Sequence, residues 1–411
     1  MSERRKYRLF EVTGIELEYM VVERGTLRVL PMVDRLFKDV AGRVVSDVAR
    51  GAIEWSNELV SHVLELKTAR PTGRIASAGP AFAREVHYIN AALEKHNAML
   101  LPTAAHPLMD PYTETVIWPH AHNEVYALYN SIFDCRGHGW SNLQSTHLNL
   151  PFANDEEFGK LHAAVRLVLP LIPALAASSP ILDGRPTGYM DSRMEAYLHH
   201  QERLPELMGS LIPEAVFSQE EYYRVVFDPI GRALAPFDTA HVMDHHFANS
   251  RGAIARFDRG AIELRVIDIQ ECPAADLAIA ELIVAVVKAL VNGRWVSTYL
   301  QRAWHEADLL AVFMRTIKDA GKAVIPHKDF LVMFGVMDAD RMPAQKLWEH
   351  LFRELGGQLS PGARKVIAHI LEHGSLAQRI MKRVGRAPSR EGIIKVYARL
   401  ADHLERNEPF A

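Results

Sequence analysis

The 411-residue sequence contains little cysteine, little net charge and no long apolar run. Its two thiols, Cys135 and Cys272, are too few for a tetrathiolate zinc site or a disulfide framework, and so low a count fits a reducing compartment. With 47 Lys and Arg against 50 Asp and Glu, the formal charge is −3. This balance argues against a protein whose whole surface binds nucleic acid or anionic lipid.

The sequence also lacks a predicted membrane span. The longest uncharged apolar run covers residues 167–182, which is shorter than a membrane span, and Pro170 and Pro173 interrupt it. Residues 1–8 are basic, but the apolar region of a signal peptide does not follow them. We therefore expect a soluble, cytoplasmic protein that acts on small molecules, with neither nucleic acid nor membrane as a partner.

Common nucleotide-binding and catalytic motifs are missing as well. The sequence has neither a Gly-x-x-x-x-Gly-Lys-Ser/Thr loop nor a Gly-x-Gly-x-x-Gly loop. It has neither a His-Glu-x-x-His helix nor a Gly-x-Ser-x-Gly turn. A nucleotide would therefore have to be bound by another arrangement, such as metal ions on carboxylates with arginines on the phosphates.

What the sequence does contain indicates an α+β fold. Apolar residues make up 48% of the chain and charged residues 24%, as in globular proteins with a large core. Alternating or β-branched segments predict strands at 12–22, 60–67, 143–150 and 261–270. Helical patterns cover 80–99, 156–177, 273–291, 304–320, 344–355, 361–373 and 390–405. Strands followed by a helical C-terminal third favour an α+β core at 1–297 with a helical region at 298–411 packed on it.

Acidic residues recur on the predicted strands. Glu16 and Glu18 alternate with apolar residues, so they point to the same face, where two carboxylates repel each other unless a cation lies between them. A solvated outer face of a sheet is the alternative. Glu65 lies in a second apolar strand, seven residues after Glu58, and an ion pair with Lys67 would also explain it.

A third strand carries Glu263 and Arg265 on one face, which would also suit a structural ion pair. Arg256, just upstream, would be either solvated or in contact with phosphate. A fourth strand offers His147. Carboxylate oxygens combined with one imidazole suit Mg²⁺ or Mn²⁺ better than a structural zinc.

The 20 histidines suggest a second possible metal site. His241, His245 and His246 have a spacing that can bind a metal on a helix, although a surface or loop cluster would give the same pattern. These residues leave open a metal-dependent hydrolase as an alternative function.

Several of these segments, taken in order from residue 14 to 270, resemble the glutamate–cysteine ligase family 2, in its bacterial carboxylate–amine ligase branch. The matching segments are Gly14-Ile15-Glu16-Leu17-Glu18, Glu58 with Glu65-Leu66, Ala105-His106-Pro107, Ser178-Ser179-Pro180 with Ser192-Arg193, and Glu263-Leu264-Arg265. The resemblance implies a glutamine-synthetase-like fold, in which helices flank a curved and mostly antiparallel sheet. It implies ATP-dependent joining of a carboxylate, typically the γ-carboxyl of glutamate, to an amine such as cysteine.

The resemblance also assigns roles to residues. The implied ligands of Mg²⁺ or Mn²⁺ are Glu16, Glu18, Glu58, Glu65, His147 and Glu263. Glu263, Arg193 and Arg265 would be catalytic, with Arg265 and Arg256 on ATP, and His106, Gln144, Ser192 and Arg193 would contact substrate. The chain departs from the family at Gln144-Ser145-Thr146-His147-Leu148-Asn149 and across residues 118–140, so the acceptor amine stays open. A non-catalytic relative that binds nucleotide or amino acid is a further alternative, and we expect a homo-oligomer.

Overall fold

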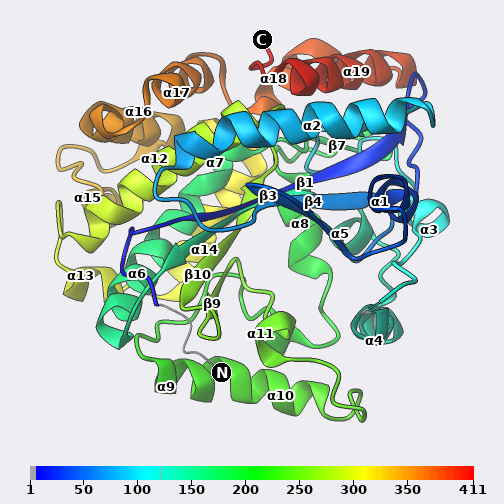
Figure 1. The fold of residues 1–411 in the computed structure, drawn as a ribbon. Helices are drawn as coiled ribbons and strands as arrows, with labels where there is room; N and C mark the ends of the chain where they lie inside the picture. The colour runs from blue at the N-terminus through cyan, green and yellow to red at the C-terminus, as the bar shows by residue number, and fades with distance from the viewer. Residues whose placement is uncertain (1–5, 122) are drawn as a thin grey trace.

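An eight-stranded sheet forms the centre of the protein, for which a computed structural model describes residues 6–121 and 123–411 (Figure 1). Its strand order is β2-β3-β4-β1-β6-β10-β9, and β5 pairs with the far end of β1. All the pairings in this sheet are antiparallel. The strands are β1 (Gly14–Glu23), β2 (Asp47–Arg50), β3 (Ile53–Asn57), β4 (Val63–Thr68), β5 (Ala98–Leu101), β6 (Ser145–Pro151), β9 (Ala253–Arg256) and β10 (Ala261–Asp268). Two small sheets pair β7 (Ile181–Leu182) with β8 (Arg185–Pro186) and β11 (Val324–Ile325) with β12 (Met342–Pro343).

Helices cover one side of the sheet in two layers. In Figure 1, α2 and α12 lie directly over the sheet, and the C-terminal helices α16 to α19 lie further out on the same side. The longer helices are α1 (Val33–Ala41), α2 (Gly79–Glu94), α4 (Asn123–Phe133), α6 (Asp155–Val168), α8 (Ser192–His199), α12 (Pro273–Val291), α14 (Glu306–Asp319), α16 (Ala344–Leu355), α17 (Pro361–His373), α18 (Leu376–Val384) and α19 (Arg390–Arg406). The shorter ones are α3 (Pro111–Glu114), α5 (His138–Ser141), α7 (Ile172–Ala176), α9 (Gln219–Tyr222), α10 (Asp228–Leu234), α11 (His245–Ala248), α13 (Thr298–Arg302) and α15 (Lys328–Val332).

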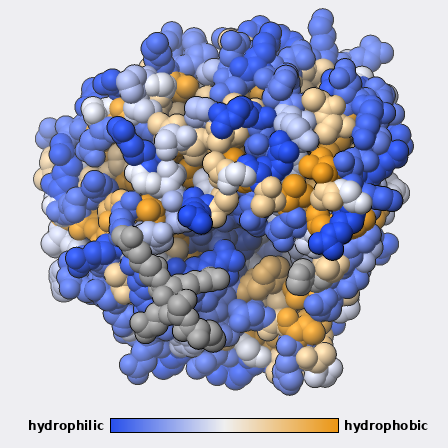
Figure 2. All heavy atoms as spheres, viewed as in Figure 1, coloured by the Kyte–Doolittle hydropathy of each residue, from blue (hydrophilic) through white to orange (hydrophobic). Residues whose placement is uncertain are grey.

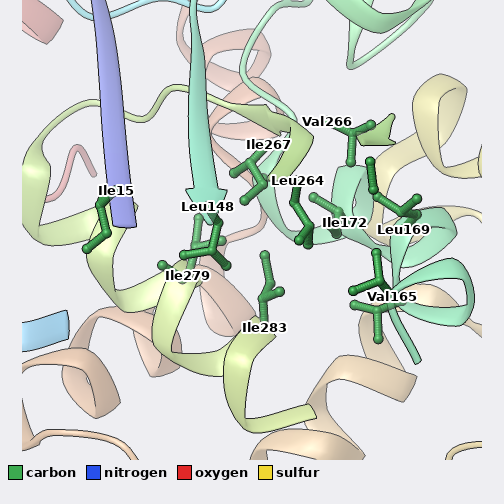
Figure 3. Packing of buried hydrophobic residues seen from close by; sticks show 14 of the residues in the cluster. Ile15, Leu148, Val165, Leu169, Ile172, Leu264, Val266, Ile267, Ile279 and Ile283 are labelled. Carbon is green, nitrogen blue, oxygen red and sulfur yellow. The ribbon is translucent and has the colours of Figure 1, made fainter. Parts of the chain in front are cut away.

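The core lies between the sheet and the helices α6, α7 and α12. Figure 3 shows Ile15, Leu148 and Leu264 of three neighbouring strands packed against Ile279 and Ile283 of α12. Each of these side chains is fully buried. Burying an aliphatic side chain of this size contributes about 1.5–3 kcal/mol, so this layer fixes which face of each strand points inward. The opposite face of the same strands is left for polar side chains.

One apolar segment in the described residues has the length of a membrane span. It runs from Asp155 to Ala176, and 94% of its most apolar window is buried inside the protein. The prolines that interrupt the run, Pro170 and Pro173, lie where α6 ends and α7 begins. This burial is that of a core helix.

The predicted α+β class is confirmed, but the strands β2, β3, β5 and β9 were not predicted, and some predicted helices end early or break. The helix predicted over 80–99 ends at Glu94, because Asn97 adopts a φ of 53° and the apolar residues after it form β5. The helix predicted over 156–177 breaks into α6 and α7 at the prolines. The division at 297/298 stays a prediction, and the later helices share the core with the sheet domain, since Trp348 Nε1 donates to the Leu171 carbonyl at 2.9 Å.

Candidate active site on the polar face of the sheet

The polar face of the central strands holds a cluster of carboxylates around one imidazole. Glu16 of β1 lies directly opposite His147 of β6, and Glu263 of β10 lies one strand further. The His147 Nδ1 is 2.9 Å from Glu16 Oε2 and 3.9 Å from Glu263 Oε1. Each of the three offers a ligand atom, and these atoms lie within 4.8 Å of one another. The structure thus brings these three predicted residues together on one face.

Glu18 joins the cluster through Ser145, which the sequence analysis did not identify. The Ser145 N–H and Oγ both donate to Glu18 Oε2, at 2.6 and 2.9 Å. Because its hydroxyl proton is used there, Ser145 Oγ can accept from His147 Nε2 at 2.9 Å. Both ring nitrogens of His147 then act as donors. Burial opposes this charge, but the hydrogen bond to Glu16 and the charge of Glu18 raise the pKa of His147 to about 9.

The charge on His147 has the opposite effect on its partner. Burial favours the neutral form of Glu16, but the hydrogen bond and charge of His147 outweigh it and lower the pKa of Glu16 to about 2. Asn149 Nδ2 also donates to Glu16 Oε1 at 3.0 Å. Glu16 is therefore fixed as a carboxylate at the centre of the polar face.

Glu65 of β4 and Glu58, just after β3, extend the cluster on the other side of β1. Glu65 pairs with Glu18 in the sheet register and accepts from Ser56 Oγ at 2.6 Å. Burial and the charge of Glu16 raise the pKa of Glu65 to about 8, although Lys67 Nζ lies 3.3 Å away. Burial and the charges of Glu18 and Glu65 raise the pKa of Glu58 well above its usual value. The Lys67 ion pair considered from the sequence exists, but it does not neutralise the cluster.

This donor set fits divalent cations that prefer oxygen ligands. Carboxylates from the strands β4, β1 and β10 and from a connecting loop converge with one imidazole from β6. Burial and the charges of neighbouring carboxylates raise the pKa of two of these carboxyl groups, Glu58 and Glu65. Mg²⁺ and Mn²⁺ take several carboxylate oxygens, and binding through this cluster would displace carboxyl protons and one ring proton of His147. The predicted ligand residues lie together, and their role as ligands stays a prediction.

Two arginines border the cluster on the β10 side. Arg265 Nε is 3.3 Å from Glu263 Oε1, and Arg256 Nη1 is 3.6 Å from Glu263 Oε2. A bulge in β10 after Leu264 shifts its register against β6, so that Val266 and Ile267 both pack into the core. Arg265 is therefore kept on the polar face, where its side chain is 29% exposed and within reach of a ligand.

Arg193 occupies a different environment from the one predicted. Its Nε donates to Asp268 Oδ1 at 2.5 Å and its Nη1 donates to the Arg265 carbonyl at 3.2 Å. The Arg193 side chain is 3% exposed and that of Asp268 is fully buried. Only Nη2 lacks a hydrogen-bond partner among the described residues. Most of the guanidinium is thus committed to holding the end of β10.

We expect Asp268→Asn to lower the free energy of unfolding by about 3–5 kcal/mol, because it leaves the buried charge of Arg193 unpaired. Urea titration of the two proteins measures this difference. The matched control is Glu354→Gln, which removes the exposed pair with Arg294 (N–O 2.7 Å) and should cost at most about 1 kcal/mol. A loss from Asp268→Asn as small as that of the control would mean that Arg193 is free for a ligand.

The other predicted substrate contacts, His106, Gln144 and Ser192, are buried side chains. The Nε2 of His106 donates to the Leu27 carbonyl at 2.8 Å and its Nδ1 accepts from Leu108 N at 3.1 Å, so both ring nitrogens are occupied. Ser192 Oγ bonds Thr187 Oγ1 at 2.7 Å. Gln144 is fully buried, and its carboxamide finds no partner within the described part of the chain. The predicted substrate roles of these three residues stay predictions.

Sequence reasoning missed the helix that lies beside the cluster. The hydroxyl of Tyr126 on α4 is 3.2 Å from Asn57 Nδ2, and burial with the charge of Glu58 raises the pKa of Tyr126. One turn later, the Tyr129 hydroxyl donates to the Phe247 carbonyl at 3.3 Å. Burial raises the pKa of Tyr129, although the charge of Arg265 opposes this. Both tyrosines fall within 118–140, whose i, i+3 aromatic spacing was the available signal. Figure 2, viewed from the same side as Figure 1, shows a hydrophobic patch at the lower right of the molecule.

The raised pKa of Glu65 predicts a pH dependence of stability. Its value is about 8 in the folded protein against 4.5 unfolded, so the folded state binds more protons between these values. The contribution of Glu65 to the free energy of unfolding is fully present below pH 4.5 and is lost as the pH rises through 8. With a chelator present, the Tm of the wild type minus the Tm of Glu65→Gln should become more negative as the pH rises from 4.5 to 8. Mg²⁺ should reduce that decline, and a flat difference would contradict the assignment.

Comparisons with known proteins found relatives in sequence and in fold. The model of the family described as glutamate-cysteine ligase family 2 matches residues 12–399. An uncharacterized protein from Archaeoglobus fulgidus is 30% identical over 400 residues, which cover 97% of this chain and 99% of that protein. A putative glutamate–cysteine ligase 2 from Bradyrhizobium sp. is 26% identical over 303 residues, which cover 71% of this chain and 64% of that protein.

Two solved structures share the fold. A glutamate–cysteine ligase from Francisella tularensis, crystallised in complex with AMP, has a TM-score of 0.61 at 11% identity over 97% of this chain and 90% of that chain. A bifunctional glutathione synthetase from Pasteurella multocida has a TM-score of 0.64 at 13% identity over 97% of this chain and 53% of that chain. At such identities the similarity is one of fold.

Proposed function

The chain belongs to glutamate-cysteine ligase family 2, a family of carboxylate–amine ligases, and we propose that it uses ATP to activate the γ-carboxyl of glutamate for amide formation. One observation carries the proposal: the carboxylates Glu16, Glu18 and Glu263 surround His147 on a polar face that Arg256 and Arg265 border. Carboxylates that can bind a cation lie beside guanidinium groups that can bind phosphate, and this combination suits a bound nucleoside triphosphate.

The chemistry explains why such a site needs ATP. A free carboxylate does not form an amide with an amine in water, because the leaving group would be oxide. When a carboxylate oxygen attacks the γ-phosphorus and ADP leaves, the product is an acyl phosphate. The amine nitrogen then attacks the acyl carbon, and phosphate departs. The protein contributes mainly the positions of the reactants and the neutralisation of charge.

The residues divide these tasks by position. Glu16, His147 and Glu263 would hold Mg²⁺ or Mn²⁺, which when bound supplies charge neutralisation on the phosphate oxygens. Arg265 and Arg256 would contact the phosphate groups, since their guanidinium nitrogens lie 3.3 and 3.6 Å from Glu263, beside the proposed ligands of the cation. The proton lost by the amine would go to the departing phosphate or to a carboxylate of the cluster.

We expect the acceptor amine to bind next to α4. The hydroxyl of Tyr126 contacts Asn57, next to Glu58. Tyr129 lies close enough to Arg265 for the charge of the arginine to affect its pKa. The helix thus borders the side of the cluster away from the packed core. Tyr126, which is partly exposed, would offer an aromatic face and a hydroxyl to an acceptor, and this segment is where the sequence differs from the family pattern. Cysteine is accordingly one acceptor to test among several.

The test is a coupled assay on the purified protein. ATP, Mg²⁺ and glutamate are incubated with a panel of amines that includes cysteine and larger apolar amines, and both phosphate release and product mass are measured. We expect phosphate release that requires Mg²⁺ and the acceptor, together with an amide product. Hydrolysis of an amide without ATP would favour the hydrolase alternative, and nucleotide binding without turnover under any condition would favour a non-catalytic relative.

A further inference from the structure

A second group of possible metal ligands lies outside the carboxylate cluster. Asp244, His245 and His246 begin α11, and each offers a ligand atom within 4.8 Å of the others. Asp258, in the turn between β9 and β10, lies against the same group, with its Oδ1 3.8 Å from His246 Nε2. His241, the third histidine of the sequence pattern, is exposed and not part of this group.

The hydrogen bonds of His246 leave one nitrogen directed at a carboxylate. Its Nδ1 is 3.0 Å from Asp244 Oδ1, which is an acceptor, so Nδ1 carries the proton and Nε2 presents a lone pair. Nε2 is buried and has no hydrogen-bond partner in the described part of the chain. Its neighbour is Asp258 Oδ1. A lone pair facing a carboxylate at this distance is repulsive unless a cation lies between them.

This arrangement is that of a metal-binding histidine. Such a residue donates one ring N–H to a carboxylate, which orients the other nitrogen toward the ion. The Nε2 of His245 is also buried without a partner among the described residues, and the two imidazole rings lie 4.3 Å apart between centroids. Two ligands of a tetrahedral ion with bonds of about 2.0–2.1 Å are roughly 3.4 Å apart, close to the 3.8 Å between His246 Nε2 and Asp258 Oδ1.

We propose that His245, His246 and Asp258 bind a divalent transition-metal ion such as Zn²⁺, with Asp244 orienting His246. Two imidazoles and one carboxylate favour zinc, cobalt or nickel over Mg²⁺, so this site is chemically distinct from the carboxylate cluster. Asp244 and Asp258 have side chains 64% and 41% exposed, so an ion can enter from solvent. Phe227 packs against both rings, with centroids 4.4 Å and 4.8 Å away, and limits their movement.

The proposed site is linked to the ligase site through a shared carboxylate. Asp258 also accepts from Arg256 Nε and Nη2, at 3.1 and 3.0 Å, and Arg256 lies 3.6 Å from Glu263. An ion that takes one oxygen of Asp258 would therefore weaken its hold on Arg256. Occupancy should change the Michaelis constant for ATP if Arg256 contacts phosphate as proposed above, but the binding of the ion does not depend on that role.

The test measures binding rather than activity. The whole protein is freed of metal with a chelator and titrated with Co²⁺ and Zn²⁺ in excess Mg²⁺, which keeps the carboxylate cluster occupied. Calorimetry gives the stoichiometry, and the visible absorption of Co²⁺ reports its coordination. We expect one equivalent of Zn²⁺ to bind, with the intense absorption of tetrahedral Co²⁺, and His245→Ala/His246→Ala to weaken binding at least ~100-fold.

Matched variants locate the ion. Asp258→Asn should also weaken Zn²⁺ binding, whereas His241→Ala and Glu16→Gln should not, and circular dichroism checks that each variant is folded. Tight binding that survives in a folded His245→Ala/His246→Ala variant, or that is lost in Glu16→Gln, would overturn the proposal. So would a wild type that binds no Zn²⁺ in excess Mg²⁺, which would leave the histidines as aromatic packing. The ligase proposal is unaffected by any of these results.

Discussion

Replacing Glu263 by glutamine is expected to lower kcat for ATP-dependent phosphate release by at least ~10³-fold. The glutamine has the same shape but removes the charge that lies 3.3 Å from Arg265 and 3.9 Å from His147. It removes one anionic oxygen ligand from the proposed Mg²⁺ site and leaves two guanidinium groups without their shared partner. The loss of kcat should be present at temperatures where the variant is fully folded. Steady-state phosphate release, with the Tm measured alongside, separates a loss of kcat from unfolding.

The control for Glu263 is Glu202→Gln, which removes an exposed carboxylate whose partner is the exposed His199. Its kcat should stay within about twofold of the wild type, because it lies outside the polar face and exposed pairs contribute little. Wild-type turnover in Glu263→Gln would exclude this strand from catalysis, and with it the assignment of the cluster as the active site.

Replacing Arg265 by lysine should lower kcat/KM for ATP by about 10²–10³-fold while keeping the positive charge. Its ion pair with Glu263 uses Nε, so the terminal Nη1 and Nη2 lie outside that pair and can form two parallel bonds to phosphate oxygens. A lysine supplies a point charge without this geometry. Initial rates over a range of ATP concentrations measure the effect.

Arg294→Lys is the matched control for Arg265, since Arg294 forms an exposed pair with Glu354. We expect its kcat/KM to be that of the wild type within about twofold. Equal effects of the two substitutions, or an Arg265→Lys enzyme that keeps its kcat/KM for ATP, would mean that charge alone acts at this position and that the fork does not contact phosphate.

The alternation of side chains along strands predicted which residues of one strand share a face. Glu16 and Glu18 share a face because the strand period is two, and Glu263 and Arg265 share one for the same reason. The period does not reveal strand order. The order β4-β1-β6-β10 is what brings Glu65, Glu18, His147 and Glu263 together, and this order was not predicted. The family resemblance implied only that these residues share a metal site.

Other features could not be read from the sequence because they depend on contacts between distant segments. Arg193 pairs with Asp268, 75 residues later, so its neighbours in sequence gave no sign of the buried partner. The bulge in β10 comes from packing two consecutive residues, Val266 and Ile267, into the core against the simple alternation. Asp258 meets His246 only because the turn between β9 and β10 folds back over α11.

The most direct test of the proposed acyl phosphate is the transfer of an oxygen isotope from glutamate to phosphate. Glutamate labelled with ¹⁸O in its γ-carboxyl is incubated with the protein, ATP, Mg²⁺ and an acceptor amine identified in the panel, and the phosphate released is examined by mass spectrometry. Because an acyl phosphate forms by attack of a carboxylate oxygen on phosphorus, one ¹⁸O should appear in each phosphate released with product. Phosphate that carries no label while amide product accumulates would contradict activation of the γ-carboxyl as an acyl phosphate.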